Sequence, residues 1–291
     1  MPELGEVEWA RKQWDPGINA KILGLEMHTQ KRVFRGADTD ALEQHLLGAT
    51  LVGSEARGKR MLFRFSGTNS KKIGAHEGIR SWLGIHLGMT GNLRIENSAF
   101  APEKHDHLVL RQANRSLVFR DSRQFGRVRF HHGSNTPDWW NDEVPEIASK
   151  AFTYAFFEKF LTRHARAPIK AVLLRQEGFS GVGNWMADEI LWRAHVFPGR
   201  AAGRINKDER KTLWRETRLV ARQSLKILGD DDSHLPRNWL IHQRWDPKGI
   251  CPKHRIPLRR ATIGGRTTAW CPKCQPGSIR RAGKSRPSRK P

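Results

Sequence analysis

Hydrophobic positions change their spacing partway along the chain, from every second residue to a helical repeat. Met61, Phe63 and Phe65 alternate with Leu62 and Arg64, and later pairs repeat this spacing: Leu108 with Leu110, Leu117 with Phe119, and Val128 with Phe130. Alternation of this kind is typical of strands that bury one face. Short strands with Gly and Asn turns therefore predict a two-sheet β-sandwich or barrel over about residues 20–130.

Helical spacing occurs before this region, briefly within it, and again from about residue 151. Val7, Ala10 and Trp14 predict a helix over residues 6–14, which Pro16-Gly17 ends. The later helices are expected at Thr39–Leu47, along the stripe Phe152–Leu161, at Trp185–His195 and from about Lys207 to Leu228. Residues 131–150 match neither period and are predicted to be a linker.

The charge points to a polyanion as partner. The 291 residues carry 52 Lys+Arg against 29 Asp+Glu, a net charge of +23, and nucleic acid is the polyanion that best fits such an excess. The first thirty residues are charged and lack the apolar run of a signal peptide. The longest apolar windows are shorter than the roughly 18 residues of a membrane span, so no membrane partner is expected.

The N-terminus offers a candidate nucleophile. If Met1 is removed, Pro2 becomes a free secondary amine beside the carboxylic acid of Glu3. Such a pair can attack a sugar C1′ while the acid protonates the sugar. Taken alone, the stretch also fits an ordinary acidic first turn of a helix.

Three further stretches suggest contacts to nucleic acid. Met89 lies between Gly88 and Gly91 at a turn, where it is either an apolar wedge for a base stack or packed under its own loop. Arg57-Gly58-Lys59-Arg60 is a basic turn before a strand. Gly178–Asn184 is a glycine-rich turn before a helix whose N-terminal N–H groups suit a phosphate.

The C-terminal region predicts a metal site. Cys251-Pro-Lys-His254 is followed by Cys271-Pro-Lys-Cys274, and these cysteines are all the cysteines of the chain. Two such pairs form a closed tetrahedral zinc site, so one structural Zn²⁺ on Cys251, His254, Cys271 and Cys274 is expected. With no cysteine elsewhere for a disulfide framework, a reducing cytoplasmic location fits.

Taken together, these stretches resemble the formamidopyrimidine-DNA glycosylase/endonuclease VIII family of base-excision repair. The matching segments are Pro2-Glu3-Leu4 with Glu6, His86–Gly91, Asp121–Gly126, Gly181–Asn184 with Ala187-Asp188-Glu189, and Arg266–Cys274. The resemblance implies a multidomain α+β fold: an N-terminal catalytic β-sandwich (1–130), the linker (131–150), a helix–two-turn–helix DNA-binding domain (151–245), a zinc β-hairpin finger (246–276) and a basic disordered tail (277–291).

The resemblance also implies roles for single residues. Pro2 is the expected nucleophile, Glu3 the proton donor and acceptor, and Lys59 a phosphate contact that assists elimination. Asn184 and Arg266 are expected to hold the phosphates beside the lesion, Arg266 as part of the catalytic set, and Lys170 lies in the family's basic strip. Met89 and Phe125 are expected to fill the space left by the extruded nucleotide, next to Gln124.

Three departures from the family pattern bear on specificity. Gly5 replaces a proline and is expected to loosen the turn that aims Pro2. Gln124 stands where members acting on 8-oxoguanine carry an arginine that reads the opposite cytosine. The segment Gly229–Lys248 lacks a long glycine-rich loop. The last two changes weaken an assignment to 8-oxoguanine opposite cytosine.

The sequence thus predicts a bifunctional DNA glycosylase/AP lyase that acts as a monomer on damaged double-stranded DNA in the cytoplasm, associated with the nucleoid. Two alternatives remain: a DNA-binding or damage-sensing protein on the same fold without lyase activity, and a basic zinc-ribbon RNA-binding protein. The second alternative accounts for residues 246–291 but not for the N-terminus.

Overall fold

The structure is a computed structural model that describes residues 1–67, 80–141, 144–231 and 234–278. Its helices are α1 (Leu4–Lys12), α2 (Thr39–Leu46), α3 (Tyr154–Arg163), α4 (Ile169–Leu173), α5 (Asn184–Arg193), α6 (Lys207–Asp231) and α7 (Ile241–Arg244). Its strands are β1 (Gly24–Met27), β2 (Thr50–Arg57), β3 (Arg60–Ser66), β4 (Arg80–His86), β5 (Asn92–Asn97), β6 (Asp106–Arg111), β7 (Arg115–Arg120), β8 (Arg127–Gly133), β9 (Arg259–Ile263) and β10 (Arg266–Trp270).

The described chain divides into two compact units. The first contains residues 1–152, 175–183 and 218–236, and the second contains 153–174, 184–217 and 237–291 as far as they are described. Each unit is thus built from separate stretches of sequence, whereas the domains expected from the sequence are contiguous. The glycine-rich turn at 175–183 groups with the first unit although the helix that follows it belongs to the second.

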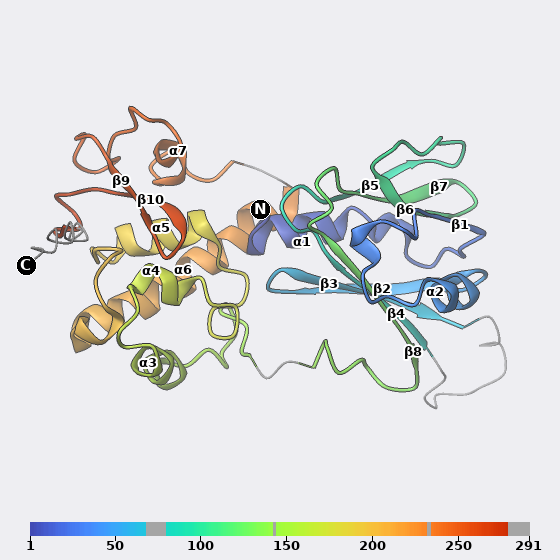
Figure 1. Cartoon of the computed structure of the whole chain (residues 1–291), viewed down its shortest axis with the longest axis horizontal. Coiled ribbons are helices and arrows are strands. Elements are labelled where there is room, and N and C mark those ends of the chain that lie inside the picture. The colour runs from blue at the N-terminus through green and yellow to red at the C-terminus, as the bar shows by residue number, and fades with distance from the viewer. Residues whose placement is uncertain (68–79, 142–143, 232–233, 279–291) are drawn as a thin grey trace, which may run out of the picture. The chain divides into compact units, whose positions relative to one another are not determined.

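The first unit is a β-sandwich of two antiparallel four-stranded sheets with the orders β1-β6-β7-β5 and β2-β3-β4-β8 (Figure 1). One core of buried side chains includes Phe63 and Phe65 of β3, Leu110 of β6 and Phe119 of β7. The alternation in the sequence therefore predicted the sheet faces correctly. Trp14, just after α1, packs in the same core against Phe63 at a ring-centroid distance of 4.7 Å.

Helix α1 begins two residues earlier than the sequence suggested, at Leu4. The carboxylate of Glu6 accepts a hydrogen bond from the backbone N–H of Glu3 at 2.6 Å, which closes a capping box over the first turn. Gly5 consequently lies within the helix rather than in a flexible turn, and its N–H donates to Ser224 Oγ on α6 at 3.2 Å. The expectation that Gly5 loosens the turn before Pro2 is therefore wrong, because Gly5 is held inside α1.

The predicted linker contains packed residues. Strand β8 extends to Gly133, and Trp140 and Ile147 are each only 1% exposed. Trp140 packs with Leu62 and Trp82 against the outer face of the second sheet. A single tryptophan anchors such a segment without producing either period, which is why the sequence pattern did not reveal it.

The second unit contains helices and the C-terminal hairpin. The predicted helices appear as α3 and α5, together with the N-terminal half of α6, while α4 and α7 are short helices that the sequence pattern did not predict. Strands β9 and β10 pair in the register Arg266↔Ile263 to Trp270↔Arg259, and β10 packs beside α5 (Figure 1). Gly264 at the tip lies against Ala171 of α4. The predicted β-sandwich, helical domain and zinc-type hairpin are thus confirmed. Most of the basic tail, residues 279–291, lies outside the described residues, as does Ser233.

Candidate active site

The N-terminal residues line a cavity of about 310 Å³ in the first unit. Pro2 and Glu6 of the N-terminal segment face Leu87, Met89 and Gly91 across it, and the remaining lining residues are Met1, Trp9, Ala10 and Asn92. Met89 is partly exposed, so it is not wholly packed under its own loop. Two segments that lie far apart in the sequence, each predicted to act on DNA, therefore share one cavity.

Glu3, which follows the lining residue Pro2 in the chain, is nearly buried, at 2% exposure. Its Oε2 accepts a hydrogen bond from the backbone N–H of Gly183 at 2.9 Å, and the backbone N–H of Leu4 donates to Gly181 O at 3.2 Å. A Cβ on Gly183 would lie 2.3 Å from the Glu3 carboxyl carbon, so only glycine permits this approach. The glycine-rich turn therefore fixes the carboxyl group of Glu3.

Lys59 lies at the turn between β2 and β3, with its Nζ 3.9 Å from Met1 Sδ. Gly58 in the same turn has φ 61, and a Cβ there would lie 2.0 Å from Ser180 Oγ. The basic turn and the glycine-rich turn are thus in direct contact. The structure brings Lys59, Pro2 and Glu3 to the same end of the sandwich.

His86 lies near Lys59 and begins the segment His86–Gly91, but the sequence did not predict a role for it. Its Nδ1 accepts a hydrogen bond from the backbone N–H of Gly88 at 3.0 Å. Burial, followed by the nearby cations Lys59, Arg35, Arg60 and Arg129, lowers the pKa of His86 to about 4. At neutral pH the ring is therefore uncharged and carries its proton on Nε2. Its position directly before Leu87-Gly88-Met89 was the sequence feature that could have indicated a role in this turn.

Gln124 and Phe125 occupy a turn between β7 and β8. Gln124 has φ 53, and its Oε1 accepts a hydrogen bond from the backbone N–H of Arg32 at 3.2 Å. Phe125 is 40% exposed, with the guanidinium carbons of Arg123 and Arg32 lying 5.0 and 5.8 Å from its ring centroid. An exposed aromatic ring between cations has the form expected of a residue that enters a base stack.

In the second unit, Asn184 begins α5 and Arg266 begins β10. The Oδ1 atom of Asn184 is buried and has no hydrogen-bond partner among the described residues, and Arg266 is exposed. Lys170 differs from its predicted DNA contact. Its side chain is fully buried, its Nζ lies 2.6 Å from Asp188 Oδ1, and it donates to Thr267 O at 3.0 Å. Because its ammonium group is enclosed by protein, Lys170 holds the second unit together instead of meeting a phosphate.

Cys251, His254, Cys271 and Cys274 converge, with their ligand atoms all within 4.8 Å of one another. Cys251 Sγ and Cys274 Sγ are 3.8 Å apart, and His254 Nδ1 lies 3.7 Å from Cys271 Sγ. Tetrahedral zinc with Zn–S bonds of about 2.3 Å places sulfur ligands about 3.8 Å apart, so the donor set fits zinc. The indole N–H of Trp192 donates to Cys251 Sγ at 3.4 Å, an outer contact that orients this ligand.

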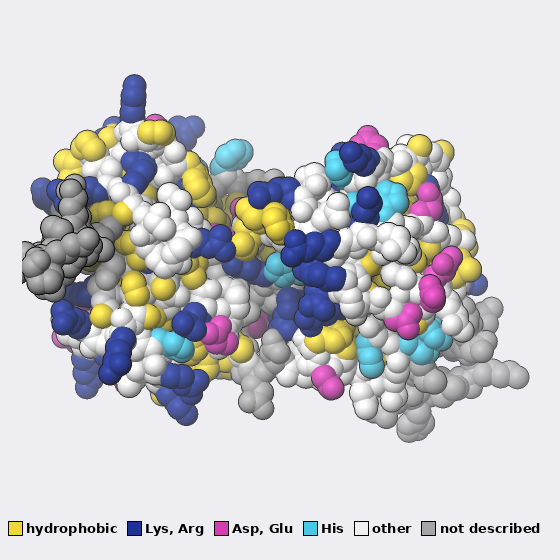
Figure 2. Space-filling model, in the orientation of Figure 1, with side chains coloured by type: hydrophobic (Ala, Val, Ile, Leu, Met, Phe, Trp, Pro, Cys, Tyr) yellow, Lys and Arg dark blue, Asp and Glu magenta, His cyan; other side chains and the backbone are white. Residues whose placement is uncertain are grey.

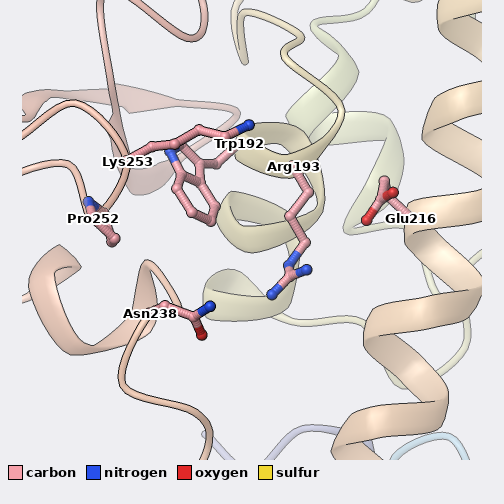
Figure 3. A pocket seen from close by; sticks show the side chains of 6 residues that line it. All are labelled: Trp192, Arg193, Glu216, Asn238, Pro252 and Lys253. Atoms are coloured by element: carbon pink, nitrogen blue, oxygen red, sulfur yellow. The ribbon is translucent and has the colours of Figure 1, made fainter.

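A larger cavity, of about 430 Å³, lies beside this metal centre and contains none of the predicted catalytic residues (Figure 3). Trp192 and Arg193 of α5, Glu216 of α6 and Lys253 line it, together with Asn238 and Pro252. Figure 3 shows side chains of both charges around it. Its size alone does not make it the reaction site, because the acid and the amine lie in the first unit.

Two family models match the chain: the formamidopyrimidine-DNA glycosylase N-terminal domain over residues 1–128 and the formamidopyrimidine-DNA glycosylase H2TH domain over residues 144–233. Across the described helices, none has the length and apolar character needed to cross a bilayer.

Relatives that carry this name match over nearly the whole length of the chain. The formamidopyrimidine-DNA glycosylase of Thermus thermophilus is 33% identical over 290 residues, covering 94% of this chain and 98% of the relative. That of Roseiflexus sp. is 32% identical, covering 94% and 100%. Among solved structures, the Lactococcus lactis formamidopyrimidine-DNA glycosylase non-covalently bound to DNA containing an AP site has a TM-score of 0.77 at 25% identity, covering 94% and 100%. The chain therefore belongs to the formamidopyrimidine-DNA glycosylase family.

Proposed function

We propose that this protein is a bifunctional DNA glycosylase/AP lyase of base-excision repair, which removes oxidised bases from damaged duplex DNA and then cleaves the abasic site. The observation that carries the proposal is the shared cavity of Pro2 and Met89, together with the buried carboxyl group of the next residue, Glu3. The relatives named as glycosylases and the Lactococcus lactis structure on DNA with an AP site support the substrate class.

Pro2 supplies the nucleophile after Met1 is removed. Its secondary amine attacks the sugar C1′, the bond to the damaged base breaks, and the base leaves with a proton. The attached amine then loses its N–H proton, and the C1′–O4′ bond opens as the ring oxygen is protonated, so that C1′ and the proline nitrogen form an iminium. The resulting iminium has no N–H to lose, so it stays cationic and acidifies the C2′ proton. Loss of that proton drives β-elimination of the 3′ phosphate, and a second elimination releases the 5′ phosphate. Water then frees Pro2 from the remaining sugar fragment.

Glu3 acts as the general acid and base. Its buried carboxyl group protonates the sugar ring oxygen as C1′ is attacked and later accepts a proton. The backbone N–H groups of Gly183 and Glu6 both donate to this carboxyl group, which holds it in place without help from solvent. Lys59 at the neighbouring turn contacts the phosphate that leaves.

The remaining residues hold and distort the DNA. Asn184 and Arg266 bind the phosphates beside the lesion, while Met89 and Phe125 fill the space of the extruded nucleotide next to Gln124. Extrusion costs a few kcal/mol, which such insertions offset. Lys and Arg side chains far outnumber Asp and Glu on the face in Figure 2, consistent with a net charge of +23 and a polyanionic partner.

Cys251, His254, Cys271 and Cys274 hold one structural zinc ion. The ion takes no part in bond breaking and stiffens the hairpin that carries Arg266. We further propose that the enzyme acts as a monomer in the cytoplasm, on the nucleoid.

Borohydride trapping tests the covalent step. With abasic duplex DNA, borohydride should reduce the iminium and leave a covalent complex whose adduct maps to Pro2. Glu3→Gln should slow base excision at least about a hundredfold, since a positioned acid contributes at least that factor. Glu43→Gln, on the exposed side of α2, is the matched control. An adduct on an internal lysine would contradict the assignment, and binding without any trapped complex would favour a damage-sensing protein.

A further inference from the structure

Two turns of the sandwich touch through their backbones. We call Leu87–Gly91 the methionine turn and Asp121–Gly126 the phenylalanine turn. Gly88 has φ 65, and a Cβ there would lie 2.4 Å from the backbone nitrogen of Gly126. The methionine turn is closed by a hydrogen bond from Gly91 N–H to Leu87 O at 2.8 Å. A side chain at position 88 would therefore force the two turns apart.

One buried carboxylate joins these turns. Asp121 is 0% exposed, and its Oδ1 accepts a hydrogen bond from the Thr90 hydroxyl at 2.6 Å, across from the other turn. Within its own turn, the same carboxylate accepts from Arg123 N–H at 3.2 Å and from Gly126 N–H at 2.7 Å. In the phenylalanine turn, the bonded residues Arg123 and Gly126 lie on either side of Phe125 in the sequence. In the methionine turn, the bonded residue Thr90 directly follows Met89.

We propose that Asp121 is a positioning residue that locks the methionine and phenylalanine turns into one rigid body, so that Met89 and Phe125 enter the base stack together. The inference rests on the proposed function, because it concerns the step in which a base leaves the duplex. A charged acceptor strengthens each of these hydrogen bonds, and the burial of Asp121 makes it costly to leave its carboxylate unpaired.

The physical benefit is preorganisation. Two side chains on independently mobile turns would each lose conformational freedom when they insert, and that loss would oppose extrusion. A single rigid body loses this freedom once, when the protein folds. Extrusion of a paired or stacked base needs both side chains, whereas a site that already lacks its base needs them less. Asp121 should therefore matter more for excision of a base than for cleavage of a preformed abasic site.

Thr90→Val is the sharpest test. Valine has the shape of threonine without the hydroxyl, position 90 is exposed, and the two backbone hydrogen bonds to Asp121 remain. Thr90→Ser keeps the hydroxyl and serves as the rescue variant. Thr162→Val removes an exposed hydroxyl from α3 that donates only to Glu158 O, and is the matched control.

Single-turnover rates should be measured on a duplex with an oxidised base and on the same duplex with an abasic site. In Thr90→Val, we expect base excision to slow about tenfold, the size of a lost hydrogen bond to a charged group, while abasic cleavage changes less than about twofold. Thr90→Ser and Thr162→Val should match the unmodified protein on both substrates. Equal slowing on both substrates, or no slowing, overturns the proposal.

Amide hydrogen exchange of the free protein tests the mechanical link without any reaction. In Thr90→Val, the amides of Gly91 and Gly126 should exchange about tenfold faster, while the amide of Leu108 in β6 keeps its rate. Unchanged exchange at both turns overturns the link. If the unmodified protein cleaves neither substrate, the proposed function fails, and the exchange rates still decide whether Asp121 couples the turns.

Discussion

Gln124 holds its side-chain carbonyl against the backbone N–H of Arg32, which leaves its amide N–H₂ group for the partner strand. A neutral amide lacks the fixed cationic fork by which arginine prefers cytosine. We predict that excision rates for one lesion differ less than about tenfold across the four opposite bases, inside the range of one good base contact. Gln124→Arg should introduce a preference for cytosine.

Single-turnover excision rates on duplexes that differ only in the opposite base measure this preference of the unmodified protein and of Gln124→Arg. A strong cytosine preference in the unmodified protein would assign the reading of the partner strand to another residue, such as Arg123.

His86 makes stability depend on pH. Its pKa is about 4 in the folded protein, against an ordinary value of 6.5, so between these values the unfolded chain binds more protons. The free energy of unfolding should therefore rise from pH 4 to pH 6.5, by about 3 kcal/mol from this residue, and level off above. In His86→Asn, Oδ1 can replace Nδ1 as the acceptor for Gly88, and this rise should largely disappear.

Urea unfolding of both proteins at several pH values measures the difference. Burial also lowers the pKa of His107 and His132, so only the difference between the two curves reports on His86. Parallel curves would assign the acid sensitivity to those other groups.

The contact of α1 with α6 reverses an ordinary helix rule. Replacing glycine by alanine inside a helix usually stabilises it by about 1 kcal/mol. A Cβ on Gly5, however, would lie 2.3 Å from Ser224 O. Gly5→Ala should therefore lower the free energy of unfolding by about 1–3 kcal/mol, as overpacking does, and slow catalysis because Pro2 and Glu3 precede α1.

Gly229→Ala on α6 is the control, since its Cβ would approach the Glu8 side chain at 3.1 Å and would lie at an ordinary contact distance of 3.8 Å from Gly5 O. Ser224→Ala should relieve part of the clash in a double variant, and thermal unfolding of the four proteins gives the coupling. If Gly5→Ala and Gly229→Ala have the same free energy of unfolding, α1 moves away from Ser224 without losing stability, and the predicted clash does not occur.

The hairpin of β9 and β10 carries the candidate metal ligands at one end. Purified protein should contain one zinc ion per chain, and His254→Ala should weaken zinc retention and DNA affinity together, while His254→Cys keeps both. Metal analysis and binding titrations measure the two quantities, with the exposed His234→Ala as control. If His254→Ala keeps its zinc and its affinity, His254 is not the fourth ligand.

The charge of the whole molecule should make DNA binding steeply dependent on salt. The logarithm of the binding constant should fall with the logarithm of salt concentration by about 0.9 for each phosphate contacted. Arg266→Gln should reduce that slope by about one contact. Arg259→Gln removes another exposed charge from the same hairpin and should change the slope less. Equal changes would mean that charge alone, and not a specific contact, acts at Arg266.

The sequence predicted what depends on regular spacing and missed what depends on distant partners. Alternation along β3 and the paired ligands at Cys251 and Cys271 follow local rules, so the sandwich and the metal cluster were predictable. The contact of Gly5 with Ser224 joins residues 219 positions apart, which no local pattern encodes. Lys170 looked like a surface cation because its buried partner, Asp188, lies on another helix. The predicted catalytic roles await the measurements above.

Asp188 gives the hairpin a second, metal-independent attachment. Its carboxylate binds Lys170 of α4 and Arg244 of α7, and accepts a hydrogen bond from the backbone N–H of Ala269 in β10 at 3.2 Å. If a bound ion were lost, these contacts would still hold the base of β10. Only the two loops that carry the ligands, Cys251–His254 and Cys271–Cys274, would then open. A chain that has lost its ion would then not need to refold before it binds another. It would recover its metal-bound form at the rate of metal binding.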